Sequence, residues 1–426
     1  MGSKNFIKKI SDLFKGGGAV TLDDLKKVCM WWLFPGILLT VVIGPHGWAR
    51  PFYIGQIVVL FNDVAALFII LYAFRSKAWP LILAVTVVLL KTIATIFAST
   101  WCSMGYVFLV NVMIFIAAGV IAFQKPDIIY KQVMFICFLS VPLMILQSAG
   151  VGGLSQILSS HYYEVARAPD VQSTLFTPLS QIAYDVRVFR PAGLLRSGTL
   201  VSLFLLFALP LHFTKTNNRV VGGTAILSAM VALAMGKIVF VGFFIVTVFV
   251  LVKGSKDQRS EIGKSAIMLV CFLCLYAFFF PGLFTHNLGL GTIKYSLFVR
   301  LNDIADALPQ VFGIREAASL ALRGTVRSPH PVAEGHASGI TVLLMFLPCL
   351  MPLIIAGVIF FVKGCRTMGD KFRERIFGCV AILIGMIISL VIFPFWKSVI
   401  YWFMMSLALL PMFFPWFQNC LKAEKL

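Results

Sequence analysis

Runs of 18 or more predominantly apolar residues recur along the whole chain, and they limit its possible folds more than any other feature. An α-helix of about 20 residues is needed to cross the hydrocarbon core of a bilayer. The chain has 426 residues and 60% of them are hydrophobic, whereas a soluble domain has about half. The alternating ten-residue segments of membrane strands are absent. We therefore expect an all-α, polytopic membrane protein.

Twelve apolar ranges give a consistent path through the membrane. If the chain starts inside, the inside segments hold 23 of the 36 Lys and Arg residues and the outside segments hold 12. This asymmetry follows the positive-inside rule and places both termini in the cytoplasm. The predicted spans are 28–44, 56–74, 78–97, 105–123, 132–150, 198–213, 220–234, 237–252, 265–283, 338–362, 376–394 and 398–416.

The same map divides the chain into segments. Residues 1–27 form a cytoplasmic amphipathic segment, in which a capping pattern at Thr21–Asp24 starts the helix that leads into the first span. Residues 28–416 form a single transmembrane domain, and residues 417–426 form a cytoplasmic tail. The net charge of +19 would indicate a nucleic-acid partner in a soluble protein. Here cytoplasmic Lys and Arg explain the charge, so no nucleic acid is expected.

The apolar range 220–252 is too long for one span, and its flanking residues Arg219 and Lys253 are both expected in the cytoplasm. Two short helices that turn at Met235-Gly236-Lys237 satisfy both conditions and place Lys237 at the outer face. The alternative is one long tilted helix from which Lys237 extends to the interface.

Two larger outer loops, at about 151–197 and 284–337, carry most of the outer arginine and histidine. The second loop has an amphipathic pattern over 301–311, in which Pro309 is expected to bend or end a helix. In the first loop, Pro191 and Gly193 predict a bent backbone before the sixth span. The candidate phosphate-binding cations are Arg187, Arg190, Arg196, Lys237, Arg300, Arg315 and Arg323, with Arg327 unranked.

These residue types fit chemistry on a lipid-linked anion. The planar guanidinium of arginine binds phosphate oxygens in pairs, and histidine or a carboxylate can deprotonate a hydroxyl. His336 and Glu334 stand directly before the tenth span and are the candidate bases. For Arg187, Arg190, Arg196 and Arg300 the alternative role is an interfacial anchor, and for His336 it is a polar residue at the interface. No spacing typical of a metal site is present.

Two charges fall inside predicted spans, Asp63 in the second and Lys91 in the third. Intramembrane ionisable groups are costly, so they pair with each other or line a path for protons or substrate. A structural pair is the preferred interpretation.

The chain resembles the superfamily of O-antigen polymerases and O-antigen ligases, which are bacterial inner-membrane glycosyltransferases. The resemblance rests on Arg190-Pro191-Ala192-Gly193, the hairpin Gly236-Lys237-Ile238-Val239, and a second outer loop that ends in His336. Two departures from the family pattern are present. The family hairpin usually carries Ser-Arg, and its histidine is commonly followed by Asn where this chain has Ala337.

The resemblance implies a GT-C-like fold, an undecaprenyl-diphosphate-linked glycan as donor at the periplasmic face, and no metal or other cofactor. It implies that Arg190, Lys237 and Arg300 hold the diphosphate. It also implies that His336 orients or deprotonates the acceptor, with Glu334 as substitute.

We expect a polymerase that acts on lipid-linked repeat units, alongside membrane lipid and a possible chain-length regulator protein. The alternatives are a ligase that moves the glycan to lipid A-core and a flippase or other transporter of lipid-linked sugar. A transporter would be expected to show internal repeats and midplane charges.

Overall fold

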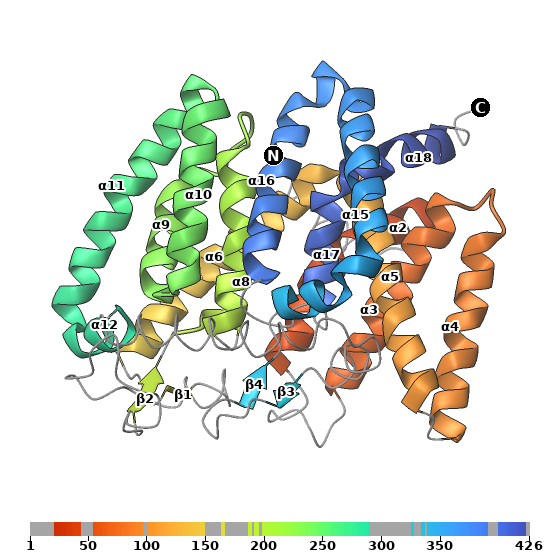
Figure 1. Ribbon diagram of the computed structural model, residues 1–426, viewed down its shortest axis with the longest axis horizontal. Helices are drawn as coiled ribbons and strands as arrows, with labels where there is room; N and C mark the ends of the chain where they lie inside the picture. The colour runs from red at the N-terminus through yellow and green to blue at the C-terminus, as the bar shows by residue number, and fades with distance from the viewer. Residues whose placement is uncertain are drawn as a thin grey trace.

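The computed structural model describes residues 21–43, 54–97, 100–149, 163–166, 186–189, 191–195, 198–288, 325–327, 334–336, 339–390 and 399–422. Helices dominate these residues, as the apolar runs predict, and Figure 1 shows them packed as one bundle. The helices are α2 (Leu22–Ile43), α3 (Ile54–Ala73), α4 (Trp79–Ile96), α5 (Thr100–Gln124), α6 (Pro126–Ser148), α8 (Gly198–Phe213), α9 (Gly223–Ala234), α10 (Lys237–Lys253), α11 (Lys256–Phe279), α12 (Pro281–Leu288), α15 (Gly339–Met368), α16 (Arg373–Leu390), α17 (Val399–Ala408) and α18 (Leu410–Lys422).

Two short 3-10 helices and two strand pairs complete the described elements. The 3-10 helices are η3 (Gly193–Leu195) and η5 (Asp370–Phe372), which precede α8 and α16. The strands are β1 (Tyr163–Ala166) with β2 (Val186–Phe189), and β3 (Thr325–Arg327) with β4 (Glu334–His336), both antiparallel. The strand pairs fall in the two predicted outer loops. The helix predicted over 301–311 lies outside the described residues.

The two ends of the bundle differ in character. Figure 1 shows β1 to β4 gathered at one end, which we call the strand end. The turns between α3 and α4, α10 and α11, and α15 and α16 lie at the other end, which we call the basic end. The described Lys and Arg residues in or beside these turns and the turns before α6 and α9 include Arg75, Lys77, Lys125, Lys215, Arg219, Lys253, Lys256, Lys363, Arg366, Lys371, Arg373 and Arg375.

The protein is a multi-pass membrane protein by the length and composition of its helices. Among the described residues, five helices are long and apolar enough to cross a membrane, or six if α17 and α18 form one bent span. Each of the twelve predicted ranges overlaps a helix. Several of these helices are short, however, and the 12 residues of α9 reach only about 18 Å. Twelve complete crossings therefore stay a prediction.

The last predicted span, 398–416, is not one straight helix. α17 and α18 meet at Leu409 with a bend of 77°. Pro411 explains the break, because its ring nitrogen cannot donate to the carbonyl of residue 407 and its ring collides with that turn. Figure 1 shows α18 running across the basic end of the bundle.

The predicted turn between two short helices at residues 235–237 is confirmed, and the single long helix is excluded. α9 ends at Ala234, Met235 adopts a left-handed conformation with φ 42° and ψ 29°, and Gly236 is extended. α10 then begins at Lys237, where the Val239 amide donates to the Gly236 carbonyl at 2.8 Å. The capping pattern is also confirmed, since Thr21 Oγ1 accepts from the Asp24 amide at 3.3 Å.

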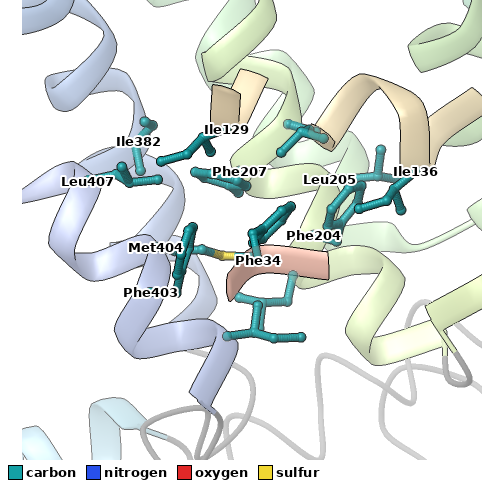
Figure 2. Close-up of a cluster of buried hydrophobic side chains, with 14 of the residues drawn as sticks. Phe34, Ile129, Ile136, Phe204, Leu205, Phe207, Ile382, Phe403, Met404 and Leu407 are labelled. Atoms are coloured by element: carbon teal, nitrogen blue, oxygen red, sulfur yellow. The ribbon is translucent and has the colours of Figure 1, made fainter. Parts of the chain in front are cut away.

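Aromatic side chains join distant parts of the sequence in the core. The ring of Phe34 on α2 stacks on Phe403 of α17 with centroids 4.8 Å apart, and lies 6.3 Å from Phe207 of α8. Figure 2 shows these rings packed with Phe204, Met404 and their neighbours. Large apolar side chains such as Ile96 and Phe278 are exposed instead on the outer faces of the bundle, as a lipid solvent favours.

The two intramembrane charges are linked through a third residue. The Tyr106 hydroxyl donates to Asp63 Oδ2 at 2.8 Å, and Lys91 Nζ lies 4.7 Å from the centroid of the Tyr106 ring. No ion pair directly joins Asp63 and Lys91 among the described residues. The predicted structural pair is replaced by an indirect link across α3, α5 and α4 by way of Tyr106.

A buried polar network ties four helices together near the basic end. Tyr130 Oη lies 3.0 Å from His212 Nδ1, and His212 Nε2 lies 3.0 Å from Thr224 Oγ1. Thr224 Oγ1 is also 2.6 Å from Glu261 Oε2, to which it donates. The Val220 amide donates to Tyr130 Oη at 2.9 Å. The network fixes the turn between α8 and α9 against α6 and α11.

Candidate functional site

The structure describes four of the predicted site residues at least in backbone. Arg187 lies in β2, Glu334 and His336 lie in β4, and Lys237 is the first residue of α10. All four belong to the strand end (Figure 1). The remaining predicted site residues lie outside the described residues; they are Arg190, Arg196, Arg300, Arg315 and Arg323.

The segment Pro191–Leu195 is fixed to the end of α6 by Gln147. Gln147 Oε1 accepts hydrogen bonds from the amides of Ala192 at 3.0 Å and Gly193 at 2.9 Å. Its Nε2 donates to the Gly193 carbonyl at 3.4 Å. Gln147 is 2% exposed, so these bonds form away from solvent. One buried side chain thus satisfies three backbone groups of a segment bounded in sequence by Arg190 and Arg196.

Gly193 is required at the bend of this segment. Its φ is +54°, in the left-handed region that favours glycine. A Cβ at this position would lie 2.9 Å from Ser140 Cβ and 3.0 Å from the Ser140 carbonyl oxygen on α6. The predicted bent backbone at Pro191 and Gly193 is therefore confirmed, and it lies directly against a helix.

The turn before Lys237 packs against the start of α8. A Cβ at Gly236 would lie 2.6 Å from Ser202 Oγ. Ser202 donates to the Gly198 carbonyl at 2.8 Å, so this bond closes the first turn of α8, which begins at Gly198 after η3 ends at Leu195. The Lys237 turn thus lies against the beginning of α8, the helix that follows the Pro191–Leu195 segment in sequence.

The position of Lys237 on its helix is electrostatically unfavourable. It is the first residue of α10 and half-buried, and a cation at a helix N-terminus opposes the helix dipole by about 0.3–1 kcal/mol.

The second strand pair sets the register of the candidate bases. Arg327 stands opposite Glu334, and Thr325 stands opposite His336. β4 ends shortly before α15 begins at Gly339. The position of Arg327 in the fold depends on the pairing of β3 with β4. Spacing along the sequence therefore cannot rank it against the other loop arginines.

Sequence reasoning also missed the polar side chains that support the strand end. Gln147, Ser140 and Ser202 are buried, and Ser148 Oγ lies 3.2 Å from Tyr276 Oη, which joins α6 to α11. The signal available in the sequence is a glutamine near the end of an otherwise apolar span. Such a residue has to find a partner, but the pattern does not identify which one.

The fold defines a multi-pass helical membrane protein, and the described segments at the strand end of its bundle carry Arg187, Lys237 and Arg327. Comparison with family models, curated proteins and solved structures found no match to this chain.

Proposed function

We propose that the protein is a glycosyltransferase of the O-antigen polymerase class. It transfers a glycan from undecaprenyl diphosphate to a hydroxyl of another lipid-linked repeat unit. The supporting observation is that the Lys237 turn lies against the beginning of α8, the helix that follows the Pro191–Leu195 segment in sequence. These are two of the three motifs on which the resemblance rests, although 41 residues separate Gly236 from Leu195 in sequence.

In this proposal, cations assist departure of the diphosphate. Charge develops on the leaving diphosphate as the glycosidic bond breaks, and fixed positive groups stabilise that charge most strongly in a site with little water. Lys237 acts as a point charge, and arginine forks add paired hydrogen bonds. The proposed arginine contacts are Arg190 and Arg300 first, followed by Arg187, Arg196, Arg315 and Arg323.

In this proposal, His336 orients or deprotonates the acceptor hydroxyl, with Glu334 as the substitute. Both residues lie in β4, which ends shortly before α15 begins at Gly339.

The proposed location is the bacterial inner membrane, with both termini in the cytoplasm and the strand end in the periplasm. The described basic-end turns carry many Lys and Arg residues, whereas the described strand-end segments carry Arg187, Lys237 and Arg327. This distribution follows the positive-inside rule if the basic end is cytoplasmic. Twelve membrane crossings in a GT-C-like arrangement are part of the same proposal.

The test uses purified protein in liposomes with native lipid-linked repeat units and a chelator of divalent metal. The expected product is a ladder of lengthened lipid-linked glycans. Transfer of glycan to lipid A-core without a ladder would identify a ligase instead. Movement of the substrate across the bilayer without any transfer would identify a transporter, and both results would contradict the polymerase proposal.

A further inference from the structure

A cavity of about 510 Å³ lies at the basic end, opposite the proposed glycan site. It is enclosed by α5, α6, α8, α16 and the junction of α17 with α18, together with the turns that precede α6 and α16. Its size falls within the roughly 300–1,000 Å³ that is usual for small-molecule sites. Nothing in the proposed glycosyl transfer uses this cavity.

The cavity has an apolar floor. Ile129, Ile382 and Leu407 line it, and Figure 2 shows these three side chains close together beside the ring of Phe207. The floor is therefore the upper surface of the hydrophobic core. A wholly polar ligand would leave this surface in contact with water, whereas the apolar part of an amphipathic ligand would cover it.

The rim of the cavity carries cations whose charge is only partly neutralised. Lys215 Nζ pairs with Asp127 Oδ1 at 2.8 Å. Glu374, the other carboxylate of the rim, accepts hydrogen bonds from the amide and hydroxyl of Thr216. Both carboxylates are thus already engaged within the protein.

Arg375 and Lys125 remain as the cations available to a ligand. Arg375 Nη1 makes a long bond of 3.4 Å to the Phe123 carbonyl, and its guanidinium lies 4.9 Å from the centroid of the Phe372 ring. Lys125 has no ion-pair partner among the residues that the structure describes. Both residues line the cavity. A planar guanidinium supported by an aromatic face is well arranged to bind phosphate oxygens.

We propose that this cavity binds the headgroup phosphate of an anionic phospholipid, with Arg375 and Lys125 as phosphate contacts. The glycerol and the nearest acyl methylenes cover the floor formed by Ile129, Ile382 and Leu407. The basic end is the membrane face where Lys and Arg gather, and basic pockets between membrane helices on that side suit anionic headgroups. This inference does not depend on the proposed glycan transfer, because it concerns the other end of the bundle.

The test measures the melting temperature of the purified full-length protein in a neutral detergent. Dioctanoyl phosphatidylglycerol, dioctanoyl phosphatidylcholine and inorganic phosphate are titrated separately. A ligand that binds only the folded state raises the melting temperature in a saturable manner. We expect phosphatidylglycerol to do so, and we expect the other two to have no saturable effect at the same concentrations.

Variants connect the effect to the cavity. Removing a charged hydrogen-bond partner costs about 1.5–3 kcal/mol, so Arg375→Gln should weaken the apparent affinity for phosphatidylglycerol about tenfold or more. Lys125→Gln removes an exposed side chain with little risk to folding and should weaken it to a smaller extent. Lys256→Gln, at the start of α11 and outside the cavity, is the matched control and should bind like the original protein.

Three results would overturn the proposal. They are an equal response to both lipids, a response to inorganic phosphate alone that matches the response to phosphatidylglycerol, and unchanged lipid affinity in both Arg375→Gln and Lys125→Gln. The second result would instead identify a site for a free anion. None of these measurements requires glycan transfer, so their failure leaves the proposed function untouched.

Discussion

Gln147 and Gly193 are joined by two hydrogen bonds across 46 positions of sequence. The Gly193 amide donates to Gln147 Oε1 at 2.9 Å, and Gln147 Nε2 donates to the Gly193 carbonyl at 3.4 Å. A buried polar side chain on α6 thereby determines the path of the chain as it enters α8. Because the Lys237 turn lies against the beginning of α8, the geometry of the proposed diphosphate site depends on a residue that has no charge to offer the substrate.

Gln147→Leu should lower the rate of glycan transfer by more than its loss of stability explains. The change leaves the amides of Ala192 and Gly193 without their partner in a buried position, at a cost of about 1–3 kcal/mol for each unsatisfied group. Melting temperature and transfer rate are measured together on the purified protein.

Gln132→Leu is the matched control for that experiment. Gln132 is also a buried glutamine on α6, and its Nε2 donates to the Trp31 carbonyl at 2.7 Å, away from the Pro191–Leu195 segment. We expect it to lower the melting temperature without a specific loss of transfer rate. Equal losses of transfer rate in the two variants at equal stability would contradict the role given to Gln147.

Gly193→Ala should be strongly destabilising. The left-handed φ of +54° strains any other residue, and the new Cβ would lie 2.9 Å from Ser140 Cβ, so strain of about 1–3 kcal/mol is joined by a steric clash. Gly222→Ala separates the two causes, because Gly222 has φ +76° with nothing within 4 Å of the added Cβ. Thermal unfolding should show the larger loss at Gly193, and a larger loss at Gly222 would refute the packing argument.

His212→Leu should lower the free energy of unfolding by about 1–3 kcal/mol, the usual cost of leaving buried polar partners unsatisfied. His212 lies within 3.0 Å of both Tyr130 Oη and Thr224 Oγ1. Each of these partners keeps one other hydrogen bond, from the Val220 amide and to Glu261 respectively, which limits the loss. Chemical denaturation of the purified protein measures it. An unchanged midpoint would show that the network does not stabilise this end.

The sequence predicts the helices well because the bilayer imposes one simple requirement. Backbone polar groups must be bonded within each segment and apolar side chains must face lipid, so apolar runs mark helices without knowledge of their neighbours. Length, together with the expected cytoplasmic position of both flanks, also located the turn at Met235-Gly236-Lys237. The bend at Leu409 was missed because apolar residues continue through it, and only Pro411 marks the break.

The site was harder to predict because it depends on contacts between distant segments. The bonds from Gln147 to Ala192 and Gly193 cross 45 and 46 positions, and no local pattern specifies such a partner. The pairing of Arg327 with Glu334 depends on strand register in the same way. The sequence identified the type of each charge and its expected position near a membrane face. It did not identify the distant groups that fix the backbone beside those charges.

Lys237 should contribute to catalysis, whereas Lys253 at the other end of α10 should not. Lys237→Met keeps the length of the side chain and removes its charge, so the transition state would lose one fixed cation. Removing one such electrostatic group typically lowers kcat about 10²–10³-fold. Lys237→Arg keeps the charge and adds paired hydrogen-bond donors, so it should retain much of the activity.

Lys253→Met is the matched control, since Lys253 ends the same helix at the basic end. It should leave kcat for chain lengthening unchanged within about a factor of two, because no exposed charge at that distance stabilises the leaving diphosphate. Full activity in Lys237→Met, or equal losses in Lys237→Met and Lys253→Met, would remove Lys237 from the diphosphate site.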